Sequence, residues 1–236
     1  MNAQPDTLLW ALTLGTIPAA IWLLFWLRED KKHPEPLRVI ISCFLLGGVA
    51  VFFSVVAERF ALPYLKNNLF LIILVWSVIE EVFKYWGALL GGFMKSSYNE
   101  PIDAIIYMLT TALGFAAFEN TLYILNSLNG SSLLESIVVS NFRFVGASML
   151  HFLSSVVLGS FIAFGFYKTP KVRKLYAFCG LLTAIALHAV FNLLIIEGAL
   201  RHTTIAFISV WIFIVAFIAI IERIKKLSPL SEEIKL

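Results

Sequence analysis

The fold is decided by residues 68–93, which read NLFLIILVWSVIEEVFKYWGALLGGF. This run is long enough to cross a bilayer core of about 30 Å, which takes roughly 20 apolar residues in a helix. It nevertheless carries three charged side chains, Glu80, Glu81 and Lys84. A charge at mid-membrane costs at least about 2.5 kcal/mol on insertion scales, so such residues persist where they are paired, hydrated or useful. The stretch therefore predicts a membrane helix with a polar centre.

Six other apolar runs accompany it, at residues 7–27, 37–57, 101–125, 144–167, 175–196 and 203–221. The chain of 236 residues is 60% hydrophobic and 14% charged, with a mean hydropathy of +0.88, far more apolar than a soluble domain. An open strand cannot satisfy its backbone in lipid, which favours helices. We therefore predict an all-α fold, a polytopic bundle of about seven transmembrane helices in a single transmembrane domain covering residues 1–236. Residues 126–143 mix turn residues with an amphipathic stretch, which leaves an eighth span open there.

The basic residues predict the orientation of this bundle, because Lys and Arg are enriched in cytoplasmic loops. Thirteen lie in the loops on one side of the predicted bundle, and three, Arg59, Lys66 and Arg201, lie on the other. We expect a multi-pass protein of the plasma membrane with its N-terminus outside and its C-terminus in the cytoplasm. The formal charge of +3 then reflects topology, and we expect the lipid bilayer and no nucleic acid as a partner.

Four consecutive predicted helices each carry a group able to move a proton or bind a metal. They hold, in order, Glu80, Glu81 and Lys84; Glu119 and Asn120; Arg143 and His151; His188 and Asn192. At about 1.5 Å per residue, the carboxylates, the histidines and Asn192 fall near the bilayer midplane or within about 10 Å of it on the outer side. Residues at one depth on helices of opposite direction indicate one polar cavity.

Spacing adds detail to this cavity. Glu80 and Lys84 have the i,i+4 spacing and the order of a favourable ion pair. Glu81 points about 100° further round the helix, so the adjacent carboxylates can serve different partners. Phe115 and Glu119 share a helix face because they are four residues apart, and so do His188 and Asn192.

The residues form four motifs on successive helices: EExxK (Glu80, Glu81, Lys84), FxxxEN (Phe115, Glu119, Asn120), an Arg and a His (Arg143, His151) and HxxxN (His188, Asn192). In this order they resemble the PrsW family of intramembrane proteases. They are more distantly similar to the CAAX prenyl endopeptidase and bacteriocin-processing superfamily, whose second motif ends in His where this chain has Glu119. The resemblance covers the predicted catalytic helices, approximately residues 68–196. It implies a bacterial membrane metalloprotease with a membrane-anchored substrate similar to an anti-sigma factor.

Peptide hydrolysis needs an activated water, a stabilised oxyanion and a proton for the leaving amine. An apolar environment favours protonation of a carboxylate, which suits Glu80 or Glu81 to act as base and later as acid. We expect Glu80 to be the base and Glu81 to hold its partners in place. Glu119 completes the set of three carboxylates.

The remaining polar residues suit supporting roles. His151 and His188 would position the water and polarise the carbonyl, and the amide of Asn192 would donate to the oxyanion. Lys84 and Arg143 are expected to offset the charge of neighbouring carboxylates, with Asn120 beside them.

A metal is left open by the sequence. Two histidines and one carboxylate form a catalytic zinc ligand set with water in the fourth position. His151, His188 and one of the glutamates, with Glu119 as the candidate, could supply it. No HExxH motif is present, so zinc and a metal-free glutamate mechanism both fit the residues.

Other functions use similar residues. Buried Glu, His and Arg also build the proton relays of transporters and channels, although the chain lacks an inverted repeat and paired broken helices. A CAAX-type prenyl-protein endopeptidase would be expected to open toward the cytoplasm, opposite to the polar residues here. A silent membrane scaffold is a further alternative. Ser154 and Ser155 follow His151 too closely to favour serine catalysis over hydrogen bonding within the bundle.

Overall fold

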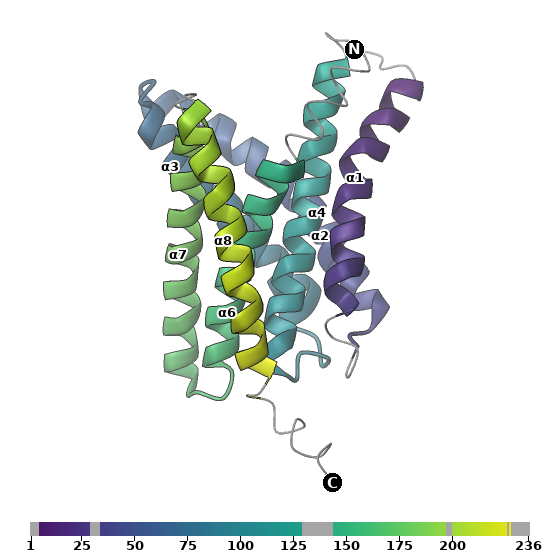
Figure 1. The fold of residues 1–236 in the computed structure, drawn as a ribbon, viewed down its shortest axis with the longest axis vertical. Helices are drawn as coiled ribbons and strands as arrows, with labels where there is room; N and C mark the ends of the chain where they lie inside the picture. The colour runs from purple at the N-terminus through teal and green to yellow at the C-terminus, as the bar shows by residue number, and fades with distance from the viewer. Residues whose placement is uncertain (1–4, 29–33, 129–143, 197–199, 226, 228–236) are drawn as a thin grey trace.

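The computed structural model describes residues 5–28, 34–128, 144–196, 200–225 and 227. These residues fold into α-helices with short 3₁₀ and π segments, and the described part contains no strand. The α-helices are α1 (Pro5–Leu27), α2 (Leu37–Ala61), α3 (Leu69–Ala88), α4 (Pro101–Leu128), α6 (Met149–Gly165), α7 (Pro170–Ile196) and α8 (Leu200–Lys225). The prediction of an all-α membrane bundle is confirmed, and the seven expected helices correspond one to one with these elements (Figure 1).

Two of the predicted helices include a wider turn. The run at residues 68–93 is divided into α3 and the π-helix η3 (Leu89–Phe93), and the run at residues 144–167 begins with the π-helix η4 (Phe144–Ser148). The hairpin between α2 and α3 contains the 3₁₀ helix η2 (Leu62–Leu65). The helix α4 extends to Leu128, and the eighth span considered for residues 126–143 lies mostly outside the described residues.

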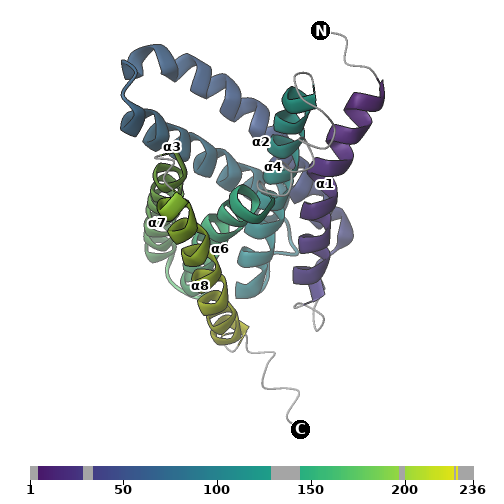
Figure 2. The same ribbon diagram turned by 45° about the horizontal axis from the view of Figure 1, so that its top comes forward.

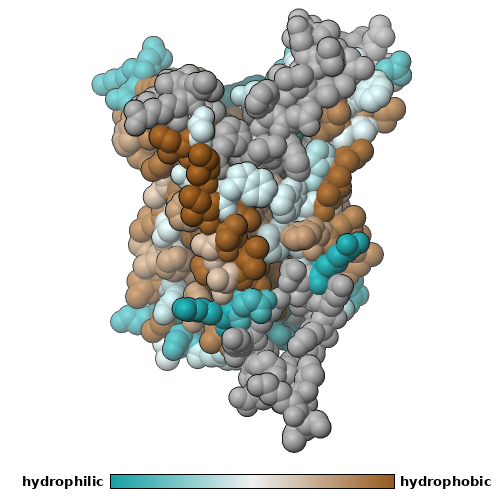
Figure 3. Space-filling model, in the orientation of Figure 1, coloured by the Kyte–Doolittle hydropathy of each residue, from teal (hydrophilic) through white to brown (hydrophobic). Residues whose placement is uncertain are grey.

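Five helical segments among the described residues are long and apolar enough to cross a membrane. They include α1, α2, α4, α6 and α7. The helix α3 has the length of a span but carries the three charges of the EExxK motif. On the face seen in Figure 3, apolar side chains surround the middle of the molecule and hydrophilic ones gather toward its ends. These features make the chain a multi-pass membrane protein.

The helix α4 is the centre of the bundle. In its most apolar window 94% of the residues are buried, against 17% in α1, which packs on α4 and exposes its other faces. The helices α2, α6 and α1 pack around α4, while α3 lies between α2 and α7 (Figures 1 and 2). The centre of the molecule is therefore enclosed by α3, α4, α6 and α7, which are the four helices that carry the polar motifs.

Close contact between α2 and α4 depends on two glycines. A Cβ on Gly114 would lie 2.0 Å from the carbonyl oxygen of Phe44, and one on Gly47 would lie 2.1 Å from that of Thr111. Small residues allow such approach between membrane helices, where dispersion contacts replace the hydrophobic effect as the driving force. The two glycines thereby fix the position of α4, and with it the position of Phe115 and Glu119.

Candidate active site

Five polar side chains from three helices meet at the centre of the bundle. Glu80, Glu81 and Lys84 belong to α3, His151 to α6 and His188 to α7. All five are buried, and Glu80 is the most exposed of them at 9%. Ionisable groups are tolerated in an apolar interior only when they pair with other polar groups, so these residues form one polar site.

Glu81 is the acceptor that organises this group. Its Oε1 accepts hydrogen bonds from Lys84 Nζ at 2.5 Å, His188 Nδ1 at 2.7 Å and Ser154 Oγ at 2.8 Å. The ion pair of Lys84 is thus with Glu81, three residues earlier, and not with Glu80, which the i,i+4 spacing favours. The physical reason is that His188 and Ser154 also donate to Glu81, which makes its Oε1 the point where negative charge is held.

Glu80 has a different environment from its neighbour. Its Oε2 lies 3.8 Å from His151 Nδ1 and 3.7 Å from His188 Nε2, too far for hydrogen bonds. This oxygen is buried and has no hydrogen-bond partner among the residues that the structure describes. A buried carboxylate oxygen without a donor is costly, so the position between the two imidazoles suits a proton, a water or a cation.

The two histidines are oriented by carboxylates. A carboxylate only accepts, so His188 donates from Nδ1 to Glu81 and its Nε2 lone pair faces Glu80. His151 Nε2 lies 3.1 Å from Glu119 Oε2 and donates to it, which leaves Nδ1 toward Glu80 and toward Lys84 Nζ at 3.3 Å. Carboxylates that fix a histidine in this way are typical of metal and catalytic sites.

Glu80, His151 and His188 could hold a metal ion, because one ligand atom from each lies within 4.8 Å of the others. A tetrahedral zinc site with ligands at about 2.0–2.1 Å places them roughly 3.3 Å apart. The distances to Glu80 Oε2 exceed this by only about half an ångström, and the unpartnered oxygen faces the same point. The residues could therefore hold a metal ion, with Glu80 as the carboxylate of the group. Glu119, the candidate from the sequence, lies instead on the other nitrogen of His151.

Phe115 forms the wall of the site on the α4 side. The centroid of its ring lies 5.5 Å from Lys84 Nζ and 5.2 Å from the centroid of the His151 ring. An aromatic face attracts a cation at this distance. Phe115 and Glu119 are one turn apart on α4, and both contact His151, which explains the FxxxE spacing in structural terms.

The other predicted site residues are not all brought into this group. Asn120 is buried and donates to Ser148 Oγ at 2.8 Å, on the side of α4 toward η4. Asn192 is half-buried, and its side chain makes no hydrogen bond within the part of the chain that the structure describes. Arg143 lies outside the described residues.

One residue of the site was not singled out from the sequence. Ser154 is fully buried and donates to Glu81, and its Oγ lies 3.5 Å from Lys84 Nζ. Its signal in the sequence is its position one turn after His151 on α6, which places both side chains toward α3. From the sequence we expect only hydrogen bonding within the bundle for Ser154, because hydroxyls in membrane helices usually bond to their own backbone.

The sequence of the chain is similar to those of known proteins. A sequence model described as PrsW family intramembrane metalloprotease matches residues 35–220. A protein named Protease PrsW from Clostridioides difficile is 27% identical over 189 residues, which are 77% of each chain. A protein of the same name from Geobacillus kaustophilus is 26% identical, over 78% of this chain and 79% of its own. Another from Halalkalibacterium halodurans is 22% identical, over 93% of this chain and 98% of its own.

No solved structure matches this chain. The family match spans α2 to most of α8 and includes every residue of the central polar group. The motif residues from Glu80 to Asn192 lie within the matched region. On this evidence the chain belongs to the PrsW family of intramembrane metalloproteases.

Proposed function

We propose that Glu80, His151 and His188 form the water-activating centre with which this protease cleaves a membrane-anchored protein. The observation that carries the proposal is the buried Glu80 Oε2, which faces one nitrogen of each histidine and has no partner among the described residues. Each histidine is held from its other nitrogen by a carboxylate. Three groups of fixed orientation thus converge on one point, as a preorganised catalytic site requires.

We propose that a zinc ion binds at this point through Glu80, His151 and His188. Bound there, it would polarise the scissile carbonyl and acidify a water molecule. Glu81 and Glu119 would hold the two imidazoles in the tautomers that leave a lone pair at the centre. Lys84 would offset the charge of Glu81, to which it is already bound at 2.5 Å.

The same oxygen supports a metal-free mechanism, in which Glu80 takes a proton from water and later returns it to the leaving amine. In both mechanisms Asn192 is proposed to donate to the oxyanion, since it lies one turn beyond His188 on α7. Arg143 and Asn120 are proposed as supporting residues. Metal removal separates the two mechanisms, because only the first depends on a bound ion.

The substrate is proposed to be a single-span membrane protein of the anti-sigma-factor kind, cleaved on the extracytoplasmic side of a bacterial plasma membrane. The excess of Lys and Arg on one side of the bundle supports a cytoplasmic C-terminus. In Figure 1 the start of α1 and the end of α8 lie at opposite ends of the bundle, as an odd number of crossings requires. The relatives named above are proteases, which favours this function over a proton-coupled transporter.

The test is cleavage of a panel of single-span bacterial membrane proteins co-expressed with this chain. We expect Glu80→Gln to abolish cleavage of any protein that the wild type cuts, because an amide neither takes a proton nor supplies a charged ligand. Glu222→Gln, which changes an exposed glutamate at the end of α8, serves as the control and should cut normally. Cleavage by Glu80→Gln at the wild-type rate would contradict the proposed centre.

The metal is tested on the purified chain. We expect about one zinc ion per molecule in the wild type and a loss of zinc in both His151→Ala and His188→Ala, with cleavage stopped by a chelator and restored by zinc. Cleavage that persists after complete metal removal would establish the glutamate mechanism in its place.

A further inference from the structure

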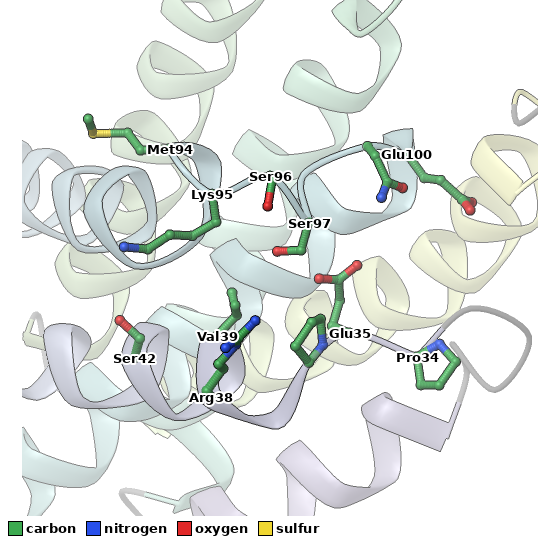
Figure 4. Close-up of a pocket in the computed structure, with 12 residues that line it drawn as sticks. Pro34, Glu35, Arg38, Val39, Ser42, Met94, Lys95, Ser96, Ser97 and Glu100 are labelled. Atoms are coloured by element: carbon green, nitrogen blue, oxygen red, sulfur yellow. The ribbon is translucent and has the colours of Figure 1, made fainter.

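A second polar cavity lies at one end of the bundle, away from the active site. It has a volume of about 990 Å³ and is enclosed by the start of α2 and the segment that joins η3 to α4 (Figure 4). Its polar lining includes Glu35, Arg38, Ser42, Lys95, Ser96 and Ser97. Lys95 follows Lys84 by eleven positions, which corresponds to about 16 Å along a helix, so the cavity is distinct from the catalytic group.

Two cations face this cavity from opposite walls. Arg38 projects from α2 and Lys95 from the segment after η3, and both side chains are exposed (Figure 4). Neither forms an ion pair with any residue in the described ranges of the chain. A pair of exposed cations on facing walls is an arrangement that an anion can bridge.

Two carboxylates also line the cavity, Glu35 and Glu100. Glu35 accepts a hydrogen bond from the hydroxyl of Tyr107, which also contacts Ser97 Oγ at 2.9 Å. Glu100 is buried, its backbone N–H donates to Asp103, and its side chain points away from Arg38 and Lys95 in Figure 4. Ser97 donates to the Tyr107 hydroxyl, and the hydroxyls of Ser42 and Ser96 remain as neutral donors beside the two cations.

Three helical elements begin or end beside the cavity, which points to the level of the lipid headgroups. The helix α2 begins there at Leu37, α4 begins there at Pro101, and η3 ends there at Phe93. Because α2 and α4 are long and apolar enough to cross the hydrocarbon core, their common end indicates its boundary. Leu37 is 69% exposed and Met94 is 68% exposed. Each is the neighbour in the chain of one of the two cations, so apolar side chains that could contact acyl chains lie next to the charged groups.

We infer that this cavity binds the phosphate of an anionic phospholipid. The fork of Arg38 suits two phosphate oxygens, while Lys95 supplies a point charge from the other wall. Basic pockets between membrane helices bind headgroups in this way, and the volume is sufficient for one. The exposed Leu37 and Met94 favour a lipid over free phosphate, which has no apolar part. The inference does not depend on the mechanism proposed for the protease.

The test measures bound lipid by native mass spectrometry, with the purified full chain in phosphatidylcholine nanodiscs that contain increasing fractions of phosphatidylglycerol. We expect Arg38→Gln/Lys95→Gln to weaken phosphatidylglycerol binding about 30-fold, since each cation near an anionic lipid surface contributes a factor of about five to the affinity. The matched control is Arg59→Gln/Lys66→Gln, which removes one exposed Arg and one exposed Lys at the other end of α2. This control should bind as the wild type does.

One more variant and a competition experiment complete the test. Arg38→Lys keeps the charge but removes the bidentate guanidinium, so it should weaken lipid binding less than the double variant does. It replaces the double variant in the test if that variant does not fold. Inorganic phosphate at millimolar concentration should not displace the lipid. Equal losses in the double variant and its matched control, or displacement by inorganic phosphate, would overturn the assignment of a lipid phosphate site.

Discussion

The centre and the end of the bundle satisfy their charges in opposite ways. At the centre the cation is paired, since Lys84 binds Glu81 at 2.5 Å, and the unpartnered atom is a carboxylate oxygen of Glu80. At the end of the bundle a carboxylate is engaged, since Glu35 accepts from Tyr107, and the cations Arg38 and Lys95 have no ion pair among the described residues. The centre therefore suits a cation or a proton, and the end suits an anion.

The difference also separates two kinds of energetic cost. Burial is complete at the centre, where Glu81 and Lys84 are both 0% exposed, so an unpaired charge there cannot be relieved by water. Arg38 and Lys95 are exposed, and water solvates them when no anion is bound. Substitutions should consequently affect stability strongly at the centre and weakly at the end.

The largest effect is expected for the ion pair on α3. Lys84→Met should lower the free energy of unfolding by about 3–5 kcal/mol, because it leaves Glu81 as a buried charge without its cation. Glu81→Gln/Lys84→Met should recover most of that loss, since Gln keeps an acceptor for Ser154 and His188 and carries no charge. Thermal unfolding of the purified variants in one detergent measures both. Wild-type stability in Lys84→Met would contradict an ionised pair.

A smaller effect is expected at Ser154, with its neighbour as the control. Ser154→Ala removes a donor to Glu81 and should cost about 1.5–3 kcal/mol, as hydrogen bonds to charged groups do. Ser155→Ala removes the same hydroxyl from a buried position without a hydrogen-bond partner among the described residues, so its stability should not fall. Ser154→Ala should also slow cleavage about tenfold, and Ser154→Thr should restore it. Equal behaviour of the two alanine variants would show that Ser154 does not position Glu81.

At the end of the bundle the corresponding substitution is Tyr107→Phe. It removes the hydroxyl that donates to Glu35 and contacts Ser97, and should cost about 0.5–1.5 kcal/mol because Glu35 is only half-buried. The rate of cleavage should stay at the wild-type value, since the hydroxyl lies outside the central group. A loss of cleavage without a loss of stability would connect the two regions and break the distinction drawn between them.

The sequence predicted the helices well because membrane burial imposes one simple rule on each of them. Long apolar runs must become helices, so the observed bounds differ from the predicted ones by a few residues at each end. The division of the third run into α3 and η3 was not predicted. Within η3, Gly91 and Gly92 pack against Cys43 and Tyr107, which are contacts with other helices that no local pattern reveals.

Within the site, the sequence identified the residue types and the helices that carry them, but not the partners of each side chain. The i,i+4 rule for isolated helices favoured Glu80 as the partner of Lys84, whereas Glu81 holds it because α6 and α7 bring Ser154 and His188 to the same oxygen. The end cavity was not foreseen for a similar reason. Its walls come from α2 and from the segment before α4, and no local pattern joins Arg38 to Lys95.

The smallest effect on stability is expected at Glu80, although it is the residue on which the proposed chemistry depends. In metal-free protein Glu80→Gln should leave the free energy of unfolding unchanged or raise it, because burying a neutral amide costs less than burying a carboxylate oxygen without a partner. Zinc should then separate the two proteins. A ligand that binds only the folded state stabilises it by about 2.7 kcal/mol at one hundred times its Kd, so zinc should raise the unfolding temperature of the wild type but not of Glu80→Gln. An equal rise in both would place zinc away from Glu80, while no rise in either would leave Glu80 as the base of a metal-free protease.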